Sequence, residues 1–207
     1  MQTPEQVWNS RYQDLAYAYG ELPNEFFKEH IQQLIPGKLF LPAEGEGRNA
    51  VHAAALGWDV NALDISEAGK NKALKLAEKH HVQIHYQVAD MGLFSYAPQS
   101  FDAIGLIYAH FPASKKSAYH QQLGQYVKMG GYIIFEAFSK SHLTYQEINP
   151  GVGGPKDKDM LFSVQEIEID FDNFETIFLK EETIELNEGI YHKGKGSVIR
   201  YIGKRCK

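Results

Sequence analysis

Apolar runs and helix-forming segments alternate along the chain from residue 38 to residue 138. Residues 39–41 form a short apolar run that breaks at Pro42 into a glycine-bearing turn. Helix formers occupy residues 50–56, and the alternating residues 60–63 end on Asp64. This order predicts a strand, a tight turn, a helix and a second strand, which together make one βαβ unit with a carboxylate at the tip of its second strand.

The alternation continues over five further elements. Ser66 can cap the first of these helices through its hydroxyl, and the third strand, like the second, ends in a carboxylate, Asp90. A turn is expected at Gly130 and Gly131, before the last strand of the series. Strands that alternate with helices in this way favour a parallel sheet with helices on both faces. The expected elements are a helix over 66–81, a strand over 82–90, a buried strand over 101–108, a helix over 113–128 and a strand over 132–138.

The pattern changes at both ends of this core. Aromatic and apolar residues recur at helical spacing within residues 1–36, which are expected to form a helical lid. Residues 139–155 are expected to form a loop whose glycine-rich end, residues 151–155, is mobile, and a helix is expected near residues 163–171. Two strands over 174–186 and 197–205 have few helix formers between them and should pair antiparallel.

Together these elements predict an α/β fold, a doubly wound and mostly parallel seven-stranded sheet with an antiparallel C-terminal strand pair. A chain of 207 residues is long enough for one such core, and no linker divides it. We therefore expect a single domain over residues 1–207. Its parts would be the lid (1–36), a cofactor-binding core (37–138), and a lid loop followed by the C-terminal strands (139–207).

Composition narrows the range of partners. The formal charge of -5, with both signs interspersed, argues against nucleic acid, because phosphate binding favours a basic face. The one cysteine, Cys206, lies beside the C-terminus, so no internal disulfide is expected and a reducing, cytoplasmic location is favoured. No apolar run approaches membrane-spanning length and no leader pattern opens the sequence, so no membrane partner is expected. The sequence does not decide the oligomeric state, and a monomer and a weak dimer are both open.

The glycine turn carries the chemistry of the βαβ unit. Residues 45–50 satisfy G-x-G-x-x-[GA], which permits NAD. The carboxylates of Glu44 and Glu46, however, would crowd a pyrophosphate at the helix N-terminus. S-adenosylmethionine carries a sulfonium and an ammonium in place of phosphate, so the carboxylates would then face cations; the alternative is that both glutamates point to solvent and favour the helix dipole. Asp64 is placed to accept hydrogen bonds from two ribose hydroxyls.

Several motifs stand out along the chain: Trp8, Arg11-Tyr12, Tyr19-Gly20 and Pro23-Asn24 near the N-terminus, and residues 43–49, 153–156 and 188–194. These motifs resemble one family, the small bacterial methyltransferases of the tellurite-resistance (thiopurine-like) type, within the class I S-adenosylmethionine-dependent superfamily. The resemblance covers nearly the whole chain. It implies the class I methyltransferase fold, S-adenosylmethionine as cofactor, and a small-molecule acceptor that is a thiol, a chalcogen or another small nucleophile.

The resemblance also implies residue roles. Gly45 and Gly47 would line the methionine part of the cofactor, Asp64 would hold the ribose, and Asp90 with Met91 would flank the adenine. The full set of cofactor-binding residues expected is Arg11, Tyr19, Glu44, Gly45, Glu46, Gly47, Arg48, Asn49, Asp64, Ile65, Asp90 and Met91.

This chain departs from the superfamily pattern in its turn. Leu41 stands where most members have an acidic residue, and Ala43 stands where they have the first glycine. Glu44 is the candidate to take over the acidic role. If it does not, cofactor affinity would be low. The missing acid at Leu41 also keeps open a non-catalytic protein of the same fold that binds S-adenosylmethionine or a nucleoside, and an NAD-binding oxidoreductase is a less favoured alternative. Residues 108–112 also lack the Asn/Asp-Pro-Pro-aromatic signature of enzymes that methylate amino groups of nucleic acids.

Candidate catalytic and substrate residues follow the core strands. Methyl transfer to oxygen or nitrogen needs a base, whereas a thiolate needs little help. His110, just past the fourth strand, is placed to be that base; the alternative is a histidine that orders its loop by bonding the backbone. Lys156, Tyr191 and His192 come from loops and are candidate substrate contacts, with solvated loop residues as the alternative.

A cluster of histidines raises the question of a metal. His80, His81 and His85 straddle a helix end and a strand start, with no cysteine and no fitting acidic partner nearby. The spacing therefore excludes a zinc site, and no metal is expected.

Overall fold

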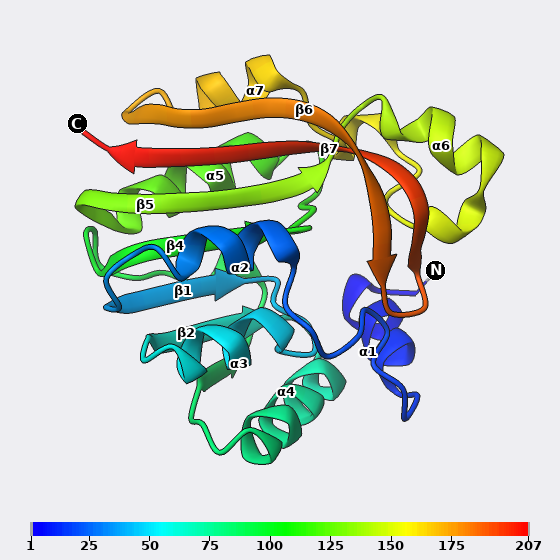
Figure 1. Ribbon diagram of the computed structural model, residues 1–207, viewed down its shortest axis with the longest axis horizontal. Coiled ribbons are helices and arrows are strands. Elements are labelled where there is room, and N and C mark those ends of the chain that lie inside the picture. Colours follow the sequence, from blue (N-terminus) through cyan, green and yellow to red (C-terminus); the bar gives the residue numbers. More distant parts are fainter. Residues whose placement is uncertain (1, 207) are drawn as a thin grey trace.

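The computed structural model describes residues 2–206 and contains one seven-stranded sheet with helices on both faces (Figure 1). The strand order is β3-β2-β1-β4-β5-β7-β6. The strands are β1 (Lys38–Pro42), β2 (Asp59–Asp64), β3 (His85–Val88), β4 (Phe101–Ile107), β5 (Val127–Phe138), β6 (Phe174–Glu188) and β7 (His192–Arg205). The α-helices are α1 (Pro4–Tyr12), α2 (Glu25–Ile31), α3 (Arg48–Ala55), α4 (Glu67–Lys79), α5 (Lys116–Tyr126), α6 (His142–Ile148) and α7 (Val164–Asp170), and three short 3₁₀ turns are η1 (Met91–Leu93), η2 (Pro150–Val152) and η3 (Lys158–Met160).

The pairing of the strands confirms the predicted fold class. The strand pairs β1–β2, β2–β3, β1–β4 and β4–β5 are parallel, and β7 pairs antiparallel with both β5 and β6. The chain is thus a mostly parallel α/β sheet that ends in an antiparallel C-terminal pair. Within residues 2–206, no helix has the length and apolar character that crossing a bilayer requires.

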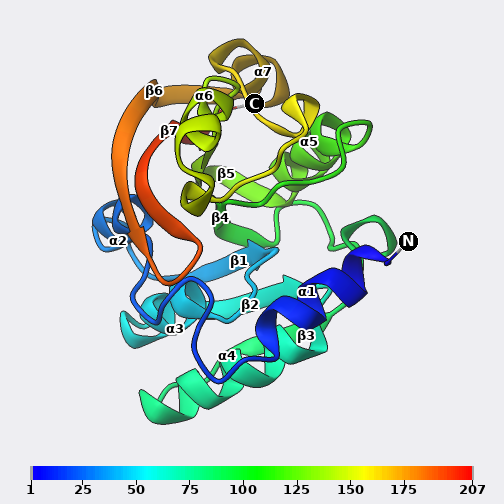
Figure 2. The ribbon, with the colours of Figure 1, turned by 90° about the vertical axis from the view of Figure 1, so that its right-hand side faces the viewer.

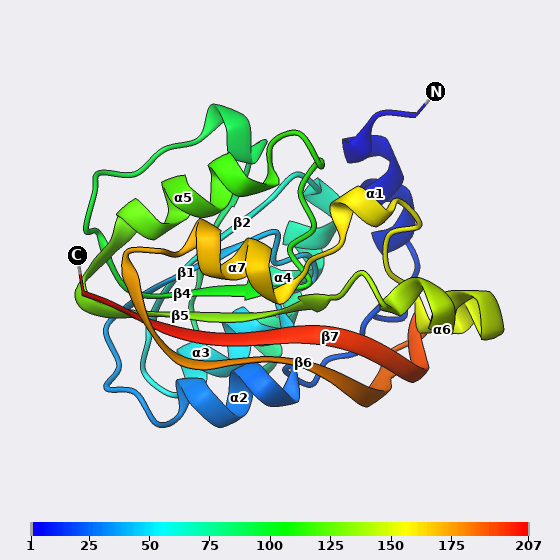
Figure 3. The ribbon, with the colours of Figure 1, turned by 90° about the horizontal axis from the view of Figure 1, so that it is seen from above.

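Alternation along the strands builds the two layers of the core. In β1, Phe40 packs in the cluster that includes the helices α5 and α7, whereas Leu39 and Leu41 pack on the opposite face with α2 and α3 (Figure 3). Gly105 of β4 permits the close approach of α2, because a Cβ there would lie 2.9 Å from the Phe27 ring and 2.6 Å from Leu41 Cδ2.

Three local predictions were wrong. A turn was predicted at Gly130 and Gly131, but both residues lie within β5, which begins directly after α5. At these residues the register between β4 and β5 shifts, so the glycines form an irregularity in the strand. The predicted loop over 139–155 contains the helix α6, a seven-residue polar helix whose apolar periodicity is too weak to detect. The last strand begins at His192, five residues before the predicted start at Ser197, because glycines interrupt the alternating pattern in that stretch.

The N-terminal segment and the tip of the β6–β7 hairpin meet above the carboxyl ends of the central strands (Figures 1 and 2). Ile190 N donates to Ala18 O at 2.8 Å. Gly189 has φ +61, and a Cβ there would lie 2.4 Å from Gly20 N, so only glycine allows the two backbones to touch. Two segments far apart in sequence therefore cover the same edge of the sheet.

Candidate active site

A cavity of about 570 Å³ opens at the carboxyl ends of the parallel strands. Its volume is in the range of small-molecule sites, and its position is where open α/β sheets bind ligands. Gly47 and Tyr191 are the two predicted site residues that do not line it. Those that do are Arg11, Tyr19, Glu44, Gly45, Glu46, Arg48, Asn49, Asp64, Ile65, Asp90, Met91, His110, Lys156 and His192.

Glu44 caps the helix that follows the glycine turn. Its Oε1 accepts from the backbone N–H of Asn49 at 2.9 Å and of Ala50 at 2.7 Å. These N–H groups at the start of α3 are the ones that a dinucleotide site offers to a pyrophosphate. Burial raises the pKa of Glu44 to about 7 despite these hydrogen bonds. Because the chain's own carboxyl group already occupies the anion position, this turn does not fit a pyrophosphate.

Asp64 ends β2 beside the turn. Its Oδ2 accepts from Gly45 N at 2.9 Å and its Oδ1 accepts from Ser66 N at 2.9 Å. Burial raises its pKa to about 6, against the lowering effect of these backbone N–H groups. Gly45 itself is in the left-handed region at φ +61, and a Cβ there would lie 2.6 Å from Tyr12 Oη. The glycine therefore lets the turn fit between Asp64 and α1.

Glu46 does not point to solvent, and its partners belong to the protein. Its Oε1 lies 2.5 Å from Lys72 Nζ, and its Oε2 accepts from Ala18 N at 2.8 Å. Lys72 Nζ also donates to Asp14 O at 2.9 Å and to Ala16 O at 2.6 Å. The Glu46–Lys72 pair therefore fixes the N-terminal segment, so Glu46 has its cation within the chain.

Gly47 serves packing. It has φ +84, and a Cβ there would lie 2.5 Å from Ala73 Cβ of α4. Because it does not line the cavity, the structure gives no contact that would place it beside the methionine part of a cofactor.

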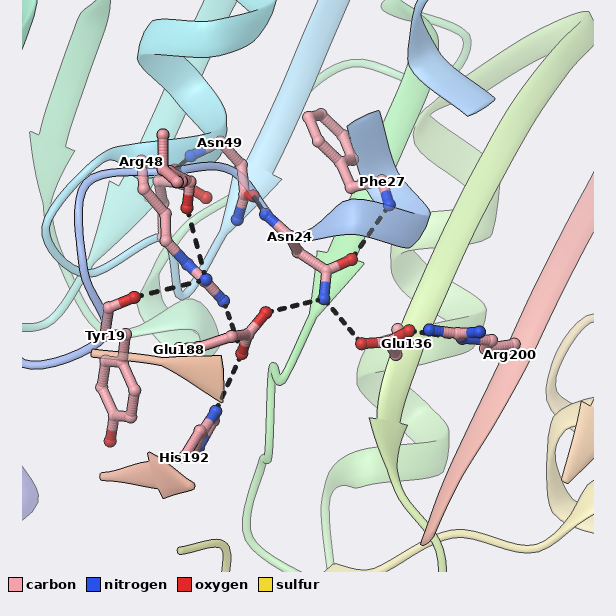
Figure 4. A network of polar contacts seen from close by, with 11 residues as sticks. Tyr19, Asn24, Phe27, Arg48, Asn49, Glu136, Glu188, His192 and Arg200 are labelled. Atoms are coloured by element: carbon pink, nitrogen blue, oxygen red, sulfur yellow. Dashed lines mark hydrogen bonds and ion pairs between the residues drawn. The ribbon is translucent and has the colours of Figure 1, made fainter. Parts of the chain in front are cut away.

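A buried polar network links the turn, the N-terminal segment and the hairpin (Figure 4). Asn24 Nδ2 donates to Glu136 Oε1 at 2.6 Å and to Glu188 Oε1 at 3.1 Å, and Asn24 N donates to Asn49 Oδ1 at 2.9 Å. Arg48 Nη2 lies 3.1 Å from Glu188 Oε2. The predicted cofactor residues Arg48 and Asn49 thus hold neighbouring segments together as well as lining the cavity.

His110 faces the cavity and also bonds the backbone of its surroundings. Its Nδ1 lies 3.1 Å from Met160 O, to which it donates, since a carbonyl can only accept. Its Nε2 is buried and has no hydrogen-bond partner among the described residues. Burial lowers the pKa of His110 to about 3, so the ring is neutral and takes up a proton weakly at neutral pH. This disfavours the predicted role of His110 as the general base.

The three predicted substrate residues lie at different positions relative to the cavity. His192 is buried in the cavity wall, Lys156 is exposed at its rim, and Tyr191 lies outside it, with its ring 4.8 Å from the guanidinium of Arg11. Arg11 Nη1 donates to Tyr19 Oη at 2.8 Å, so both residues reach the cavity from the N-terminal segment.

Sequence reasoning missed Tyr108, which follows β4. It lies in the left-handed region at φ +51, and its hydroxyl is buried close to the Glu136 carboxylate. Backbone strain of this kind in a non-glycine residue gathers at functional sites. Its position directly after the fourth strand could have identified it from the sequence, but only His110, two residues further on, was chosen there as a candidate.

No group of three His, Cys, Asp or Glu side chains that could hold a metal occurs in the described part of the chain.

Residues 43–131 match the family described as methyltransferase domain. This match covers less than half of the chain and, together with the fold, supports methyl transfer from S-adenosylmethionine as its enzymatic activity. Its cofactor is therefore S-adenosylmethionine. The occupied anion position at Glu44 agrees with a cofactor that has no phosphate. A search of curated proteins gave no match.

Solved structures share the fold of this methyltransferase. One is a protein studied for the conversion of a disulfide bond into a thioacetal group during echinomycin biosynthesis, at 16% identity and TM-score 0.77, covering 99% of this chain and 93% of that one. TehB from Haemophilus influenzae is 18% identical with TM-score 0.71, over 98% of this chain and 67% of that one. An S-adenosylmethionine-dependent methyltransferase from Methanosarcina mazei is 14% identical with TM-score 0.64, over 89% and 99%.

Proposed function

We propose that this methyltransferase transfers the methyl group of S-adenosylmethionine to a small-molecule acceptor bound in the same cavity. The observation that carries the proposal is the roof over the strand ends, where the N-terminal segment and the hairpin tip are bonded to each other and to the glycine turn. A roof of this kind leaves room for a small ligand and restricts access by a macromolecule. The acidic charge balance of the chain supports the same conclusion against nucleic acid.

The nucleoside is assigned to the β2 and β3 side of the cavity. Asp64 at the end of β2 would accept hydrogen bonds from the ribose, and Ile65, Asp90 and Met91 supply a largely apolar wall beside it for the adenine. Glu44 lines the cavity at the start of α3, so it would take over the role of the acid missing at Leu41 by facing the cofactor's cationic groups. The cofactor supplies an electrophilic methyl group on a sulfonium.

The acceptor is assigned to the β4, β5 and β7 side. This half is lined by Tyr108, His110, Phe138 and His192, with Met160 beside His110. Aromatic and apolar walls exclude water, which favours an in-line displacement at carbon. Sulfur is the first acceptor atom to test, because the echinomycin protein that shares this fold acts at a disulfide. The fold shared with TehB supports placing the chain near the tellurite-resistance type, with a thiol, chalcogen or other small nucleophile as acceptor.

Cofactor affinity should depend on pH through two carboxyl groups. Burial raises the pKa of Asp64 to about 6 and that of Glu44 to about 7. Both groups accept best when ionised, so affinity for S-adenosylhomocysteine should rise as the pH increases through this interval. Calorimetric titrations from pH 5 to pH 8 measure this, and Asp64→Asn should remove the part of the rise that is centred near 6.

The stability of the cofactor-free protein should change in the opposite sense. A carboxyl group whose pKa is raised by folding contributes stability that is complete below its ordinary pKa and is lost as the pH rises through the folded value. The contributions of Asp64 and Glu44 therefore disappear as the pH passes about 6 and about 7.

The affinity measurement can contradict this account. An affinity for S-adenosylhomocysteine that stays constant from pH 5 to pH 8 would show that neither carboxyl group contacts the cofactor.

The function is tested by a methyl-transfer assay that detects S-adenosylhomocysteine. A panel of aliphatic and aromatic thiols, phenols and amines should contain at least one acceptor, while bulk RNA and unfolded protein should give no turnover. Hydrogen exchange of residues 12–24 should also slow when S-adenosylhomocysteine is added, because the roof closes over it. Turnover with RNA or protein alone would contradict a small acceptor. Cofactor binding with no turnover on any acceptor would favour a non-catalytic binding protein.

A further inference from the structure

Glu188 and His192 face each other at the tip of the β6–β7 hairpin. The two residues are direct partners in the antiparallel register, at the last position of β6 and the first of β7. His192 Nδ1 lies 3.0 Å from Glu188 Oε2 (Figure 4). The histidine is 4% exposed and lines the cavity in the half assigned to the acceptor. The hairpin thus carries a carboxylate–imidazole pair to the cavity wall.

Glu188 is an ionised acceptor. Burial by itself would raise its pKa, but the charge of Arg48, together with hydrogen bonds from His192 and Arg48, lowers it to about 2. Asn24 Nδ2 donates to its other oxygen at 3.1 Å. Because an ionised carboxylate only accepts, the proton between the pair belongs to His192 Nδ1.

The free nitrogen of His192 is therefore a base. Burial lowers the pKa of His192, so the ring is neutral near pH 7 with its proton on Nδ1 and a lone pair on Nε2. Nε2 makes no hydrogen bond to any described residue. The ring is held in place by Tyr19 and Tyr108, each at a centroid distance of 4.6 Å, and by Phe138 at 5.1 Å.

His110 offers a built-in comparison. Both histidines line the cavity, and both have Nδ1 bonded to a protein oxygen. The partner of His110 is the neutral carbonyl of Met160, whereas the partner of His192 is a carboxylate. A carboxylate stabilises the imidazolium that forms when Nε2 takes a proton, and a carbonyl does so much less. The pair at the hairpin tip is the better arranged for proton transfer.

We propose that His192 is the general base that takes the acceptor's proton during methyl transfer, and that Glu188 is its positioning residue. The proposal rests on the function proposed above. As the bond from the acceptor atom to the methyl carbon forms, the S–CH₃ bond breaks and its electron pair stays on sulfur. The acceptor's proton moves to His192 Nε2 and later leaves to water, so the products are S-adenosylhomocysteine, methylated acceptor and one proton. The acceptor class is thus one that enters protonated and neutral, such as an alkyl thiol, a phenol or an amine.

Several charged or titratable groups surround this ring and set its pH response. Glu188 lies on β6 and favours the protonated ring, whereas the positive charges of Arg48 on α3 and Arg11 on α1 oppose it. The other titratable groups packed near it are Tyr19, Tyr108, His110 and His142.

The test compares two thiols that differ in acidity. Benzyl mercaptan is mainly protonated at neutral pH, whereas 4-nitrothiophenol is ionised and needs no base. His192→Gln should lower kcat/KM for benzyl mercaptan by about 100-fold or more, and much less for 4-nitrothiophenol. Glu188→Gln should lower the benzyl mercaptan rate by about 10-fold or more and shift its pH profile. His85→Gln, at the start of β3 and outside the cavity, is the matched histidine control.

Equal losses on both thiols in His192→Gln would overturn the assignment of the base. If the wild-type protein methylates neither thiol, that result counts against the proposed function, and the state of the ring decides the base separately. ¹⁵N NMR of the imidazoles at pH 7 should find His192 neutral, protonated at Nδ1 and bare at Nε2, and Glu188→Gln should change this tautomer balance. A ring that is protonated at Nε2 would overturn the proposal whatever acceptor is used.

Discussion

Replacing Glu136 by alanine is expected to lower the free energy of unfolding by about 3 kcal/mol. Glu136 is fully buried near the end of β5. Its Oε2 lies 2.6 Å from Arg200 Nε, and its Oε1 accepts from Asn24 Nδ2 at 2.6 Å. Removing the carboxylate leaves a half-buried guanidinium and a buried amide short of their acceptor, and that desolvation is not recovered.

Urea denaturation monitored by circular dichroism measures this loss. The control is Glu182→Ala, because Glu182 is the other, more exposed partner of Arg200, at 3.1 Å. Its removal should cost less than about 1 kcal/mol, as exposed ion pairs do. A loss of the same small size for Glu136→Ala would show that the network in Figure 4 is not what holds the N-terminal segment to the sheet.

Replacing Asp64 by alanine is expected to weaken binding of S-adenosylhomocysteine by about 10- to 150-fold. A hydrogen bond to a charged acceptor contributes about 1.5–3 kcal/mol, and each 1.4 kcal/mol is tenfold in affinity. The substitution removes the ribose acceptor and also the acceptor of Gly45 N in the glycine turn. Isothermal calorimetry measures the affinity.

The matched control for this experiment lies on the same strand. Asp59→Ala changes an exposed carboxylate at the opposite end of β2, away from the cavity, and should leave the affinity unchanged. Asp64→Asn keeps the shape of the side chain and separates the loss of charge from the loss of packing. An Asp64→Ala variant that binds as tightly as the wild type would mean that the ribose lies elsewhere.

The order of elements was predictable because the core strands are buried on both faces. Near-continuous apolar runs such as 101–107, separated by helix-period segments, leave few alternatives for the sheet. The segments that failed carry weak local signals. The helix α6 buries only His142, and β7 begins with alternating lysines and glycines whose strand character comes from pairing with β6. The secondary structure of such segments depends on pairing with distant parts of the chain, which the local sequence pattern does not show.

The residues of the site also fall into those that could be predicted from the sequence and those that could not. Asp64 and the glycine turn were found because their positions follow directly from the strand ends. The partners of Glu46 were not predictable, since Lys72 and the backbone of Ala18 come from distant parts of the chain. His192 was noticed only as one residue of a motif, because its pairing with Glu188 depends on the hairpin register. Single residues at strand ends can be read from sequence, whereas pairs across elements require the fold.

The most direct test of the central claim is a pair of calorimetric titrations on the unmodified protein, one with S-adenosylhomocysteine and one with NADH. The claim is that the crevice at the carboxyl ends of β1 and β2 takes a phosphate-free nucleoside, because Glu44 already fills the anion position at the start of α3. The account predicts saturable one-to-one binding of S-adenosylhomocysteine and no heat of binding with NADH. Binding of NADH without binding of S-adenosylhomocysteine would contradict it.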